Sequence, residues 1–250
     1  MKTQINYQES HEFATDLQIA QSLFLPEILK DENVIGVLFT GSRVIGDVNP
    51  NSDYDFRVLL KDGVSRYRKG FYLNNLFAEI FCNSYIQEMS YLLEETTGSE
   101  NTALDLFMYK TGIIIHDPTH KMSEIKSKAT ELYDLGPAPI SYRQKDWIRY
   151  DLAINKLKLE GLDLTDTHHF FILEIEHRLV DYFFKLSGAW KVRFRDTNSK
   201  IQSLDSVFHK HFSQVLNTSD NAQKTEMLVK SIEHLQNKFS LDQSVEFSVL

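Results

Sequence analysis

Cysteine is nearly absent from this sequence, because Cys82 is the only one among 250 residues. A single thiol excludes an intrachain disulfide and a thiolate metal cluster, and it favours a reducing compartment. Long apolar runs are also missing, since no stretch approaches the roughly 20 apolar residues of a membrane span. The N-terminal segment lacks the apolar region of a secretory signal. We therefore expect a cytoplasmic protein without a membrane partner.

Basic residues are too few for a broad cationic surface. The chain has 27 Lys and Arg against 35 Asp and Glu, which gives a net charge of -8 at pH 7. Nucleic-acid-binding domains usually carry a basic face, so this charge argues against an RNA or DNA partner. Repeats and low-complexity tracts are missing too. The composition fits a nucleotide or small-molecule substrate better, and we expect a monomer or a homodimer.

The apolar residues that are present predict alternating helices and strands in the first half of the chain. Ser10 can cap a helix over residues 11–30, whose apolar stripe ends near Pro26. The changes in apolar period predict strands at residues 34–39, 54–60, 76–82 and 112–118, and helices at residues 85–95 and 101–111.

A break at residues 135–139, which read Leu-Gly-Pro-Ala-Pro, divides the chain, because two prolines and a glycine cannot continue a helix. The predicted domains are therefore residues 1–136 and residues 137–250. Helical patterns follow at residues 140–160, 166–187, 199–217 and 221–239, before a strand pattern at residues 245–250. The predicted fold class is α+β: a mixed sheet flanked by helices, then a C-terminal up-and-down helical bundle.

Two alternating aspartates follow the first predicted strand after a glycine-serine turn. Side chains alternate along a strand, so Asp53 and Asp55 share a face, with Cα atoms roughly 6.5 to 7 Å apart. Their carboxylates repel each other unless cations lie between them, and two divalent ions about 3.5 to 4 Å apart would fit. Magnesium is the default, because it prefers carboxylate and phosphate oxygens. Alone, the aspartates are more typical of an exposed polar turn.

The glycine-serine turn favours the functional interpretation. Gly41 lets the backbone approach a ligand closely, and Ser42 offers a hydroxyl and amide groups to a phosphate. Ten residues, from Arg43 to Ser52, then lead to Asp53. This order and spacing resemble the polymerase-β-like nucleotidyltransferase superfamily, in particular its small-molecule branch. That branch, which includes the aminoglycoside nucleotidyltransferases, often adds a helical domain that binds the acceptor.

The resemblance implies a third carboxylate on a later strand. Glu79 is the candidate, because it is the single charge in an apolar run and would be costly to bury without a partner. An outward-facing position on an edge strand would also explain it, and Asp105 is a weaker alternative. The resemblance then implies that Asp53, Asp55 and Glu79 hold Mg²⁺. It further implies that Gly41, Ser42 and Arg43 bind the nucleotide.

Residues of the second half are candidates for the remaining roles. In similar helical domains a basic residue after a glycine turn reaches the phosphates, and Arg195 and Lys200 are placed to do so. A solvated basic loop near a helix end is an equal alternative. Asp146 or Asp151 could be the general base for the acceptor hydroxyl, although both fit a polar helix face as well.

The leading hypothesis is a magnesium-dependent nucleotidyltransferase. It would move a nucleoside monophosphate, most readily AMP from ATP, to a small-molecule hydroxyl that attacks the α-phosphorus as pyrophosphate leaves. One alternative is a protein-modifying, AMPylating enzyme similar to the minimal nucleotidyltransferase antitoxins. Another is a catalytically silent nucleotide-binding regulatory module.

Overall fold

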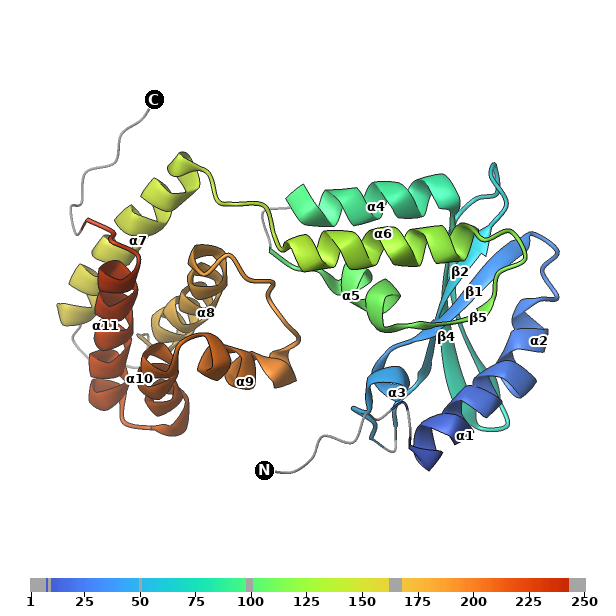
Figure 1. Ribbon diagram of the computed structural model, residues 1–250. Helices are drawn as coiled ribbons and strands as arrows, with labels where there is room; N and C mark the ends of the chain where they lie inside the picture. Colours follow the sequence, from blue (N-terminus) through green and yellow to red (C-terminus); the bar gives the residue numbers. More distant parts are fainter. Residues whose placement is uncertain (1–7, 9, 50, 98–100, 162–167, 243–250) are drawn as a thin grey trace. The chain divides into compact units, whose positions relative to one another are not determined.

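A computed structural model describes residues 8, 10–49, 51–97, 101–161 and 168–242 (Figure 1). The chain divides into two compact units, residues 1–97 with 103–135 and residues 98–102 with 136–250. A mixed sheet with helices forms the first unit, and helices form the second, so the predicted α+β class is confirmed. Within the described part of the chain, none of the helices combines the length and apolarity of a membrane span.

The N-terminal helical segment begins where the sequence predicts it. Ser10 accepts a hydrogen bond from the backbone N–H of Phe13 at 3.1 Å and caps α1 (His11–Ile19). A π-helical turn, η2 (Ala20–Phe24), and α2 (Leu25–Ile28) continue the segment. Pro26 lies in the first turn of α2, within the helical range predicted for residues 11–30.

Five strands of the described chain form one mixed sheet in the order β3-β4-β2-β1-β5. Strands β2 and β4 run parallel, and the other neighbours run antiparallel. Four of these strands confirm the sequence prediction, while β3 was overlooked. Their bounds are β1 Val34–Thr40, β2 Tyr54–Leu60, β3 Tyr67–Leu73, β4 Leu76–Ser84 and β5 Ile113–His116.

The two faces of the sheet have different coverings. Tyr54, Phe56 and Val58 of β2 are buried on the face that packs against α1, η2 and α2 (Figure 1). Asp55 and Arg57 alternate with them and therefore point to the opposite face. On that face lie α4 (Tyr85–Thr97), α5 (Leu104–Thr111) and α6 (Lys121–Leu135). The sequence analysis overlooked α6, although its buried residues recur at helical spacing: Met122, Ile125, Ala129 and Leu132.

The second unit consists of helices around its own apolar core. Its helices are α7 (Tyr142–Glu160), α8 (His168–Leu186), α9 (Phe194–Leu204), α10 (Ser206–Asn217) and α11 (Asn221–Lys238). The helix predicted over 199–217 is two helices, because Asp205 adopts an extended conformation and caps α10. Asn101 and Thr102 join this unit by bonding to residues 189–191, a link that the predicted boundary after residue 136 did not include. The strand predicted at residues 245–250 lies outside the described residues.

Candidate active site

Strand pairing brings three carboxylates together at one edge of the first unit. Asp55 lies opposite Thr40 in the β1–β2 pair and opposite Glu79 in the parallel β2–β4 pair. Asp53 immediately precedes β2. One oxygen from each carboxylate lies within 4.8 Å of the others, and all three residues are half-buried. The structure therefore gathers the residues that the sequence analysis selected as metal ligands.

Gly41 makes room for this cluster. It lies between β1 and the short helix α3 (Ser42–Ile45), with φ of 83° and ψ of -162°, a conformation that is almost confined to glycine. A Cβ atom at this position would lie 2.0 Å from Oδ2 of Asp55. The backbone of the turn therefore passes against the Asp55 carboxylate, where no other amino acid fits without displacing it.

The electrostatics of the cluster favour a bound cation. Burial, together with the neighbouring charges of Asp53 and Glu79, raises the pKa of Asp55 to about 7, against the opposing effect of Arg57. A divalent cation would relieve this repulsion, and hard carboxylate oxygens are the ligands that Mg²⁺ prefers. The donor set therefore fits a magnesium site.

Two arginines border the carboxylates. Arg68 on β3 donates to Oε1 of Glu79 from Nε at 2.9 Å and from Nη2 at 2.6 Å. Arg57 on β2 is buried and pairs with Asp105 on α5. Asp105 is thus engaged by an arginine, whereas the three-carboxylate cluster contains Glu79. Neither arginine was predicted as a site residue from the sequence, although Arg57 is the single basic residue of its predicted strand.

Arg43, predicted to bind the nucleotide, holds the loop before β2. Its guanidinium pairs with Asp16 at 2.9 Å, stacks on Tyr54 at 4.2 Å, and donates to the carbonyl oxygens of Ser52 and Asp53. These contacts fix the main chain that carries Asp53. The neighbouring Ser42 hydroxyl makes no hydrogen bond with a described residue, so it is available to a ligand.

The other predicted site residues belong to the second unit. Asp146 accepts a hydrogen bond from Arg149 at 2.8 Å on α7, and Arg195 and Lys200 lie on α9. Asp151 is buried, with all three of its partners at 2.8 Å: Asn155, Arg178 and Tyr182. These contacts give Asp151 a structural role. The roles suggested for Asp146, Arg195 and Lys200 stay predictions.

A cavity of about 740 Å³ extends from the carboxylates over the same sheet face. Its walls combine charged and aromatic residues of β2, β4, α4 and α5 with Arg66, Tyr67 and Arg68 at the edge strand β3. The sequence analysis did not find this cavity, because β3 contributes to it and was not recognised as a strand. Its dimensions are in the range of small-molecule sites, which are about 300 to 1,000 Å³.

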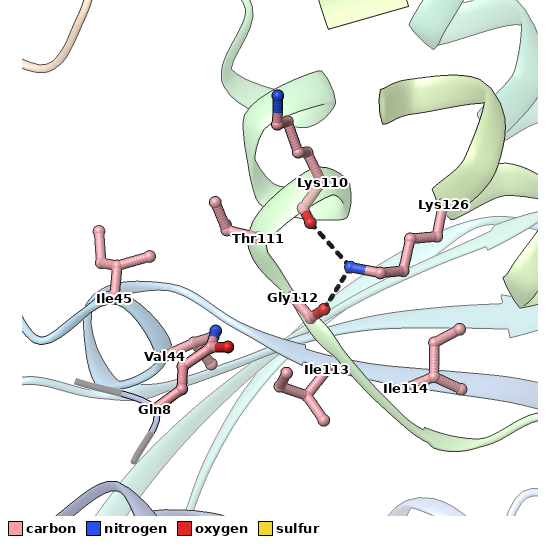
Figure 2. Close-up of a pocket in the computed structure, with 9 residues that line it drawn as sticks. All are labelled: Gln8, Val44, Ile45, Lys110, Thr111, Gly112, Ile113, Ile114 and Lys126. Atoms are coloured by element: carbon pink, nitrogen blue, oxygen red, sulfur yellow. Dashed lines mark hydrogen bonds between the residues drawn. The ribbon is translucent and has the colours of Figure 1, made fainter. Parts of the chain in front are cut away.

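A second cavity, of about 590 Å³, lies beside the end of α5 (Figure 2). Figure 2 shows the ammonium group of Lys126 donating to the carbonyl oxygens of Lys110 and Gly112, each at 2.7 Å. It also bonds the carbonyl oxygen of Tyr109 at 3.2 Å, and burial lowers the pKa of Lys126. Lys126 therefore satisfies the carbonyl groups at the end of α5, which is a structural role.

Comparisons with known proteins agree with this geometry. Residues 24–127 match the nucleotidyltransferase domain family, and this range includes the glycine turn and all three carboxylates. A search of curated proteins finds no significant match. Among solved structures, the chain is similar to a nucleotidyltransferase-like protein from Exiguobacterium sibiricum, with a TM-score of 0.51 and 14% identity. The match covers 88% of this chain and 74% of that one, so the similarity of fold includes residues of the helical unit.

Proposed function

We propose that the protein, whose residues 24–127 match the nucleotidyltransferase domain family, is a magnesium-dependent nucleotidyltransferase of the small-molecule branch. It transfers a nucleoside monophosphate, AMP from ATP, to a hydroxyl group of a small molecule and releases pyrophosphate. The observation that carries this proposal is the cluster of three carboxylates within 4.8 Å, set against the Gly41 turn. The cytoplasm, favoured by the single free thiol, is the proposed location.

The residues of the first unit have distinct tasks in this reaction. Asp53, Asp55 and Glu79 would hold Mg²⁺, which neutralises phosphate charge and orients the triphosphate when it is bound. Asp55 must lose its proton to act as a ligand. The Ser42 hydroxyl and the amides of the Gly41 turn donate hydrogen bonds to the terminal phosphates. Arg43 acts indirectly, because it fixes the loop that carries Asp53.

The second unit is proposed to contribute to acceptor recognition. Its helices carry Asp146, Arg195 and Lys200, for which we propose the tasks of general base and phosphate contacts. A helical unit in the same chain favours a small acceptor over a separate protein partner, which is the main alternative. The net charge of -8 argues against an RNA acceptor.

The test is pyrophosphate release with each of the four ribonucleoside triphosphates, magnesium and a library of hydroxyl compounds. We expect ATP to be preferred and release to require a divalent ion. Asp53→Asn, Asp55→Asn and Glu79→Gln should each lower kcat/KM by at least about 100-fold, because each removes charge stabilisation from the transition state.

The matched control is Asp62→Asn, which removes an exposed carboxylate beyond the end of β2 in the same unit. This variant should keep full activity. Pyrophosphate release that persists in both Asp53→Asn and Asp55→Asn would contradict the metal assignment. Transfer of AMP to a protein rather than to any small molecule would favour the protein-modifying alternative.

A further inference from the structure

The floor of the 740 Å³ cavity consists of successive rows of side chains across three strands. The first row is acidic and joins Asp55 to Glu79, with Gly70 of β3 opposite Glu79. The next row joins Arg57, Phe81 and Arg68. Alternate residues of a strand are roughly 7 Å apart, so a basic row runs beside the acidic row at about that distance.

The basic row is ordered by one aromatic ring. The guanidinium carbon of Arg57 lies 4.5 Å from the ring centroid of Phe81, and that of Arg68 lies 4.4 Å from it. Cations are attracted to an aromatic face at such distances. Phe81 therefore holds both arginines on the cavity side of the sheet, although 63% of the Arg68 side chain is exposed.

The charges of the cavity are unequal once metal ions occupy the carboxylates. The buried Arg57 is neutralised by an ion pair with the half-buried Asp105. Asp55 and Glu79 are ligands in the proposed function, so their charges are matched by metal. Arg66 bonds to the hydroxyl of Tyr91, and no carboxylate of the described residues pairs with it. Arg66 and Arg68 then provide a surplus of positive charge.

Arg68 has hydrogen-bond donors that its contact with Glu79 does not use. A guanidinium carries five N–H groups, and Arg68 directs two of its nitrogens to a single oxygen of Glu79. The other N–H groups have no partner among the described residues, which leaves them for an oxyanion. Arg68 can therefore hold Glu79 and bind a planar carboxylate or a phosphate at the same time.

We infer that the acceptor is a small hydroxyl compound that also carries an anionic group, a phosphate or a carboxylate, bound by Arg68 and Arg66. The inference rests on the proposed function. The acceptor hydroxyl lies near the carboxylate row, and the anionic group lies at the basic row, a few carbon atoms away. Tyr91 and Leu104 on the cavity wall contact the carbon frame. A cationic acceptor such as an aminoglycoside is disfavoured here.

The experiment is calorimetric titration of the full-length protein with compounds matched in shape and different in charge. Two sets are used: glycerol with glycerate and glycerol 3-phosphate, and glucose with glucosamine, glucuronate and glucose 6-phosphate. Each is titrated with and without Mg²⁺ and α,β-methylene ATP. We expect the anionic members to bind at least 10-fold more tightly than the neutral and cationic ones. Comparing the affinities of the carboxylate and the phosphate compounds shows which anionic group the protein prefers.

Variants assign the preference to the cavity. Arg68→Ala should lower the affinity for the anionic compounds at least 10-fold, and Arg66→Ala should lower it several-fold. Lys69→Ala is the matched control, because Lys69 is the next cation of β3, points to the other sheet face and stacks on Phe71 at 5.1 Å. Lys69→Ala should bind like the wild type.

Several results would overturn the inference. These are equal binding of neutral or cationic compounds, a preference that survives both arginine variants, or no binding of any anionic compound. An oligoribonucleotide that binds more tightly than every small anion would also overturn it. Binding of α,β-methylene ATP, and its loss in Asp53→Asn, are measured first. A failure of the nucleotide to bind contradicts the proposed function and is thus distinct from a failure of the anion preference.

Discussion

At the scale of single residues, the fit between Gly41 and Asp55 is the tightest feature of the site. We expect Gly41→Ala to lower magnesium affinity at least 10-fold and the free energy of unfolding by about 2 to 4 kcal/mol. The reasons are the strained backbone and the methyl group, which would lie 2.0 Å from Oδ2 of Asp55. Calorimetric magnesium titration and urea unfolding measure the two quantities.

Gly63→Ala is the control for this substitution. Gly63 also has a positive φ, of 85°, but a Cβ atom there meets no other atom within 4 Å. Gly63→Ala should lower the free energy of unfolding by only about 1 to 2 kcal/mol, because only the backbone conformation becomes strained. It should leave magnesium affinity unchanged. Equal effects of the two substitutions on magnesium affinity would show that the close approach at Asp55 is unimportant.

Asp55 links magnesium binding to pH. Because its pKa is raised to about 7 in the folded protein, a proton competes with the metal below that pH. Magnesium affinity should therefore rise with pH up to about 8 and then level off. Asp55→Asn should abolish this dependence together with most of the affinity. A wild-type affinity that stays constant between pH 6 and 8 would contradict the prediction.

The same pKa affects stability without metal. The folded protein retains the Asp55 proton up to about pH 7, whereas the unfolded chain releases it near the ordinary carboxyl pKa of 3.8. The stabilising contribution of the protonated form is therefore complete below that value and is lost as pH rises through about 7. Asp55→Asn should then raise the free energy of unfolding at pH 8 by about 2 kcal/mol, because it removes the buried negative charge. This value takes 1.36 kcal/mol for each pKa unit and is reduced for solvent screening.

At the scale of elements, the junction between α9 and α10 depends on Asp205. Its carboxylate accepts from the backbone N–H groups of Val207 and Phe208 and contacts His234 and Lys238 of α11, both at 2.7 Å. These donors hold the pKa of Asp205 well below its usual range. Asp205→Ala should lower the free energy of unfolding by about 2 to 3 kcal/mol, because a helix cap and the ion-pair contacts of a buried carboxylate are lost together.

Asp220→Ala is the matched control. Asp220 caps α11 in the same way, by accepting from Ala222 and Gln223, but it is exposed. Its loss should cost about 1 kcal/mol. Thermal unfolding at pH 7 compares the two variants. A similar cost for both would mean that the contacts of Asp205 to α11 add nothing. The contribution of Asp205 is present above the unfolded pKa and is lost as pH falls through the folded one.

At the scale of the whole molecule, the two units have separate apolar cores. One core contains Phe24, Phe39 and Phe56, the other contains Phe183 and Phe208, and the two clusters share no residue. We expect magnesium and ATP to raise the unfolding temperature of the first unit more than that of the second, because the three carboxylates and the Gly41 turn belong to the first unit. At 100 times the dissociation constant the stabilisation is about 2.7 kcal/mol.

Scanning calorimetry of the intact chain tests this expectation. Asp205→Ala should lower the transition of the second unit and leave the ligand-dependent one in place. A single transition that moves equally with ligand and with Asp205→Ala would show that the units unfold together. In that case, separate cores would not imply separate stability.

Several elements and the clustered carboxylates could be predicted from the sequence for local reasons. Strands β1, β2 and β4 are apolar runs, and the spacing of Gly41, Asp53 and Asp55 is a sequence property. Edge strand β3 was not predicted, because it pairs on one side only and is mostly exposed, so it lacks an apolar signal. The division at Asp205 was missed because the apolar pattern continues through it.

The sequence by itself determined the order and spacing of the Gly41 turn and the two aspartates, and these favour a cation site once the carboxylates lie close together. Only the tertiary structure decided which third carboxylate joins them. Parallel pairing of β2 and β4 sets Glu79 opposite Asp55, while Asp105 is taken by Arg57. It also set Arg68 beside Glu79, because a strand's neighbour depends on the order of the sheet and not on its own residues.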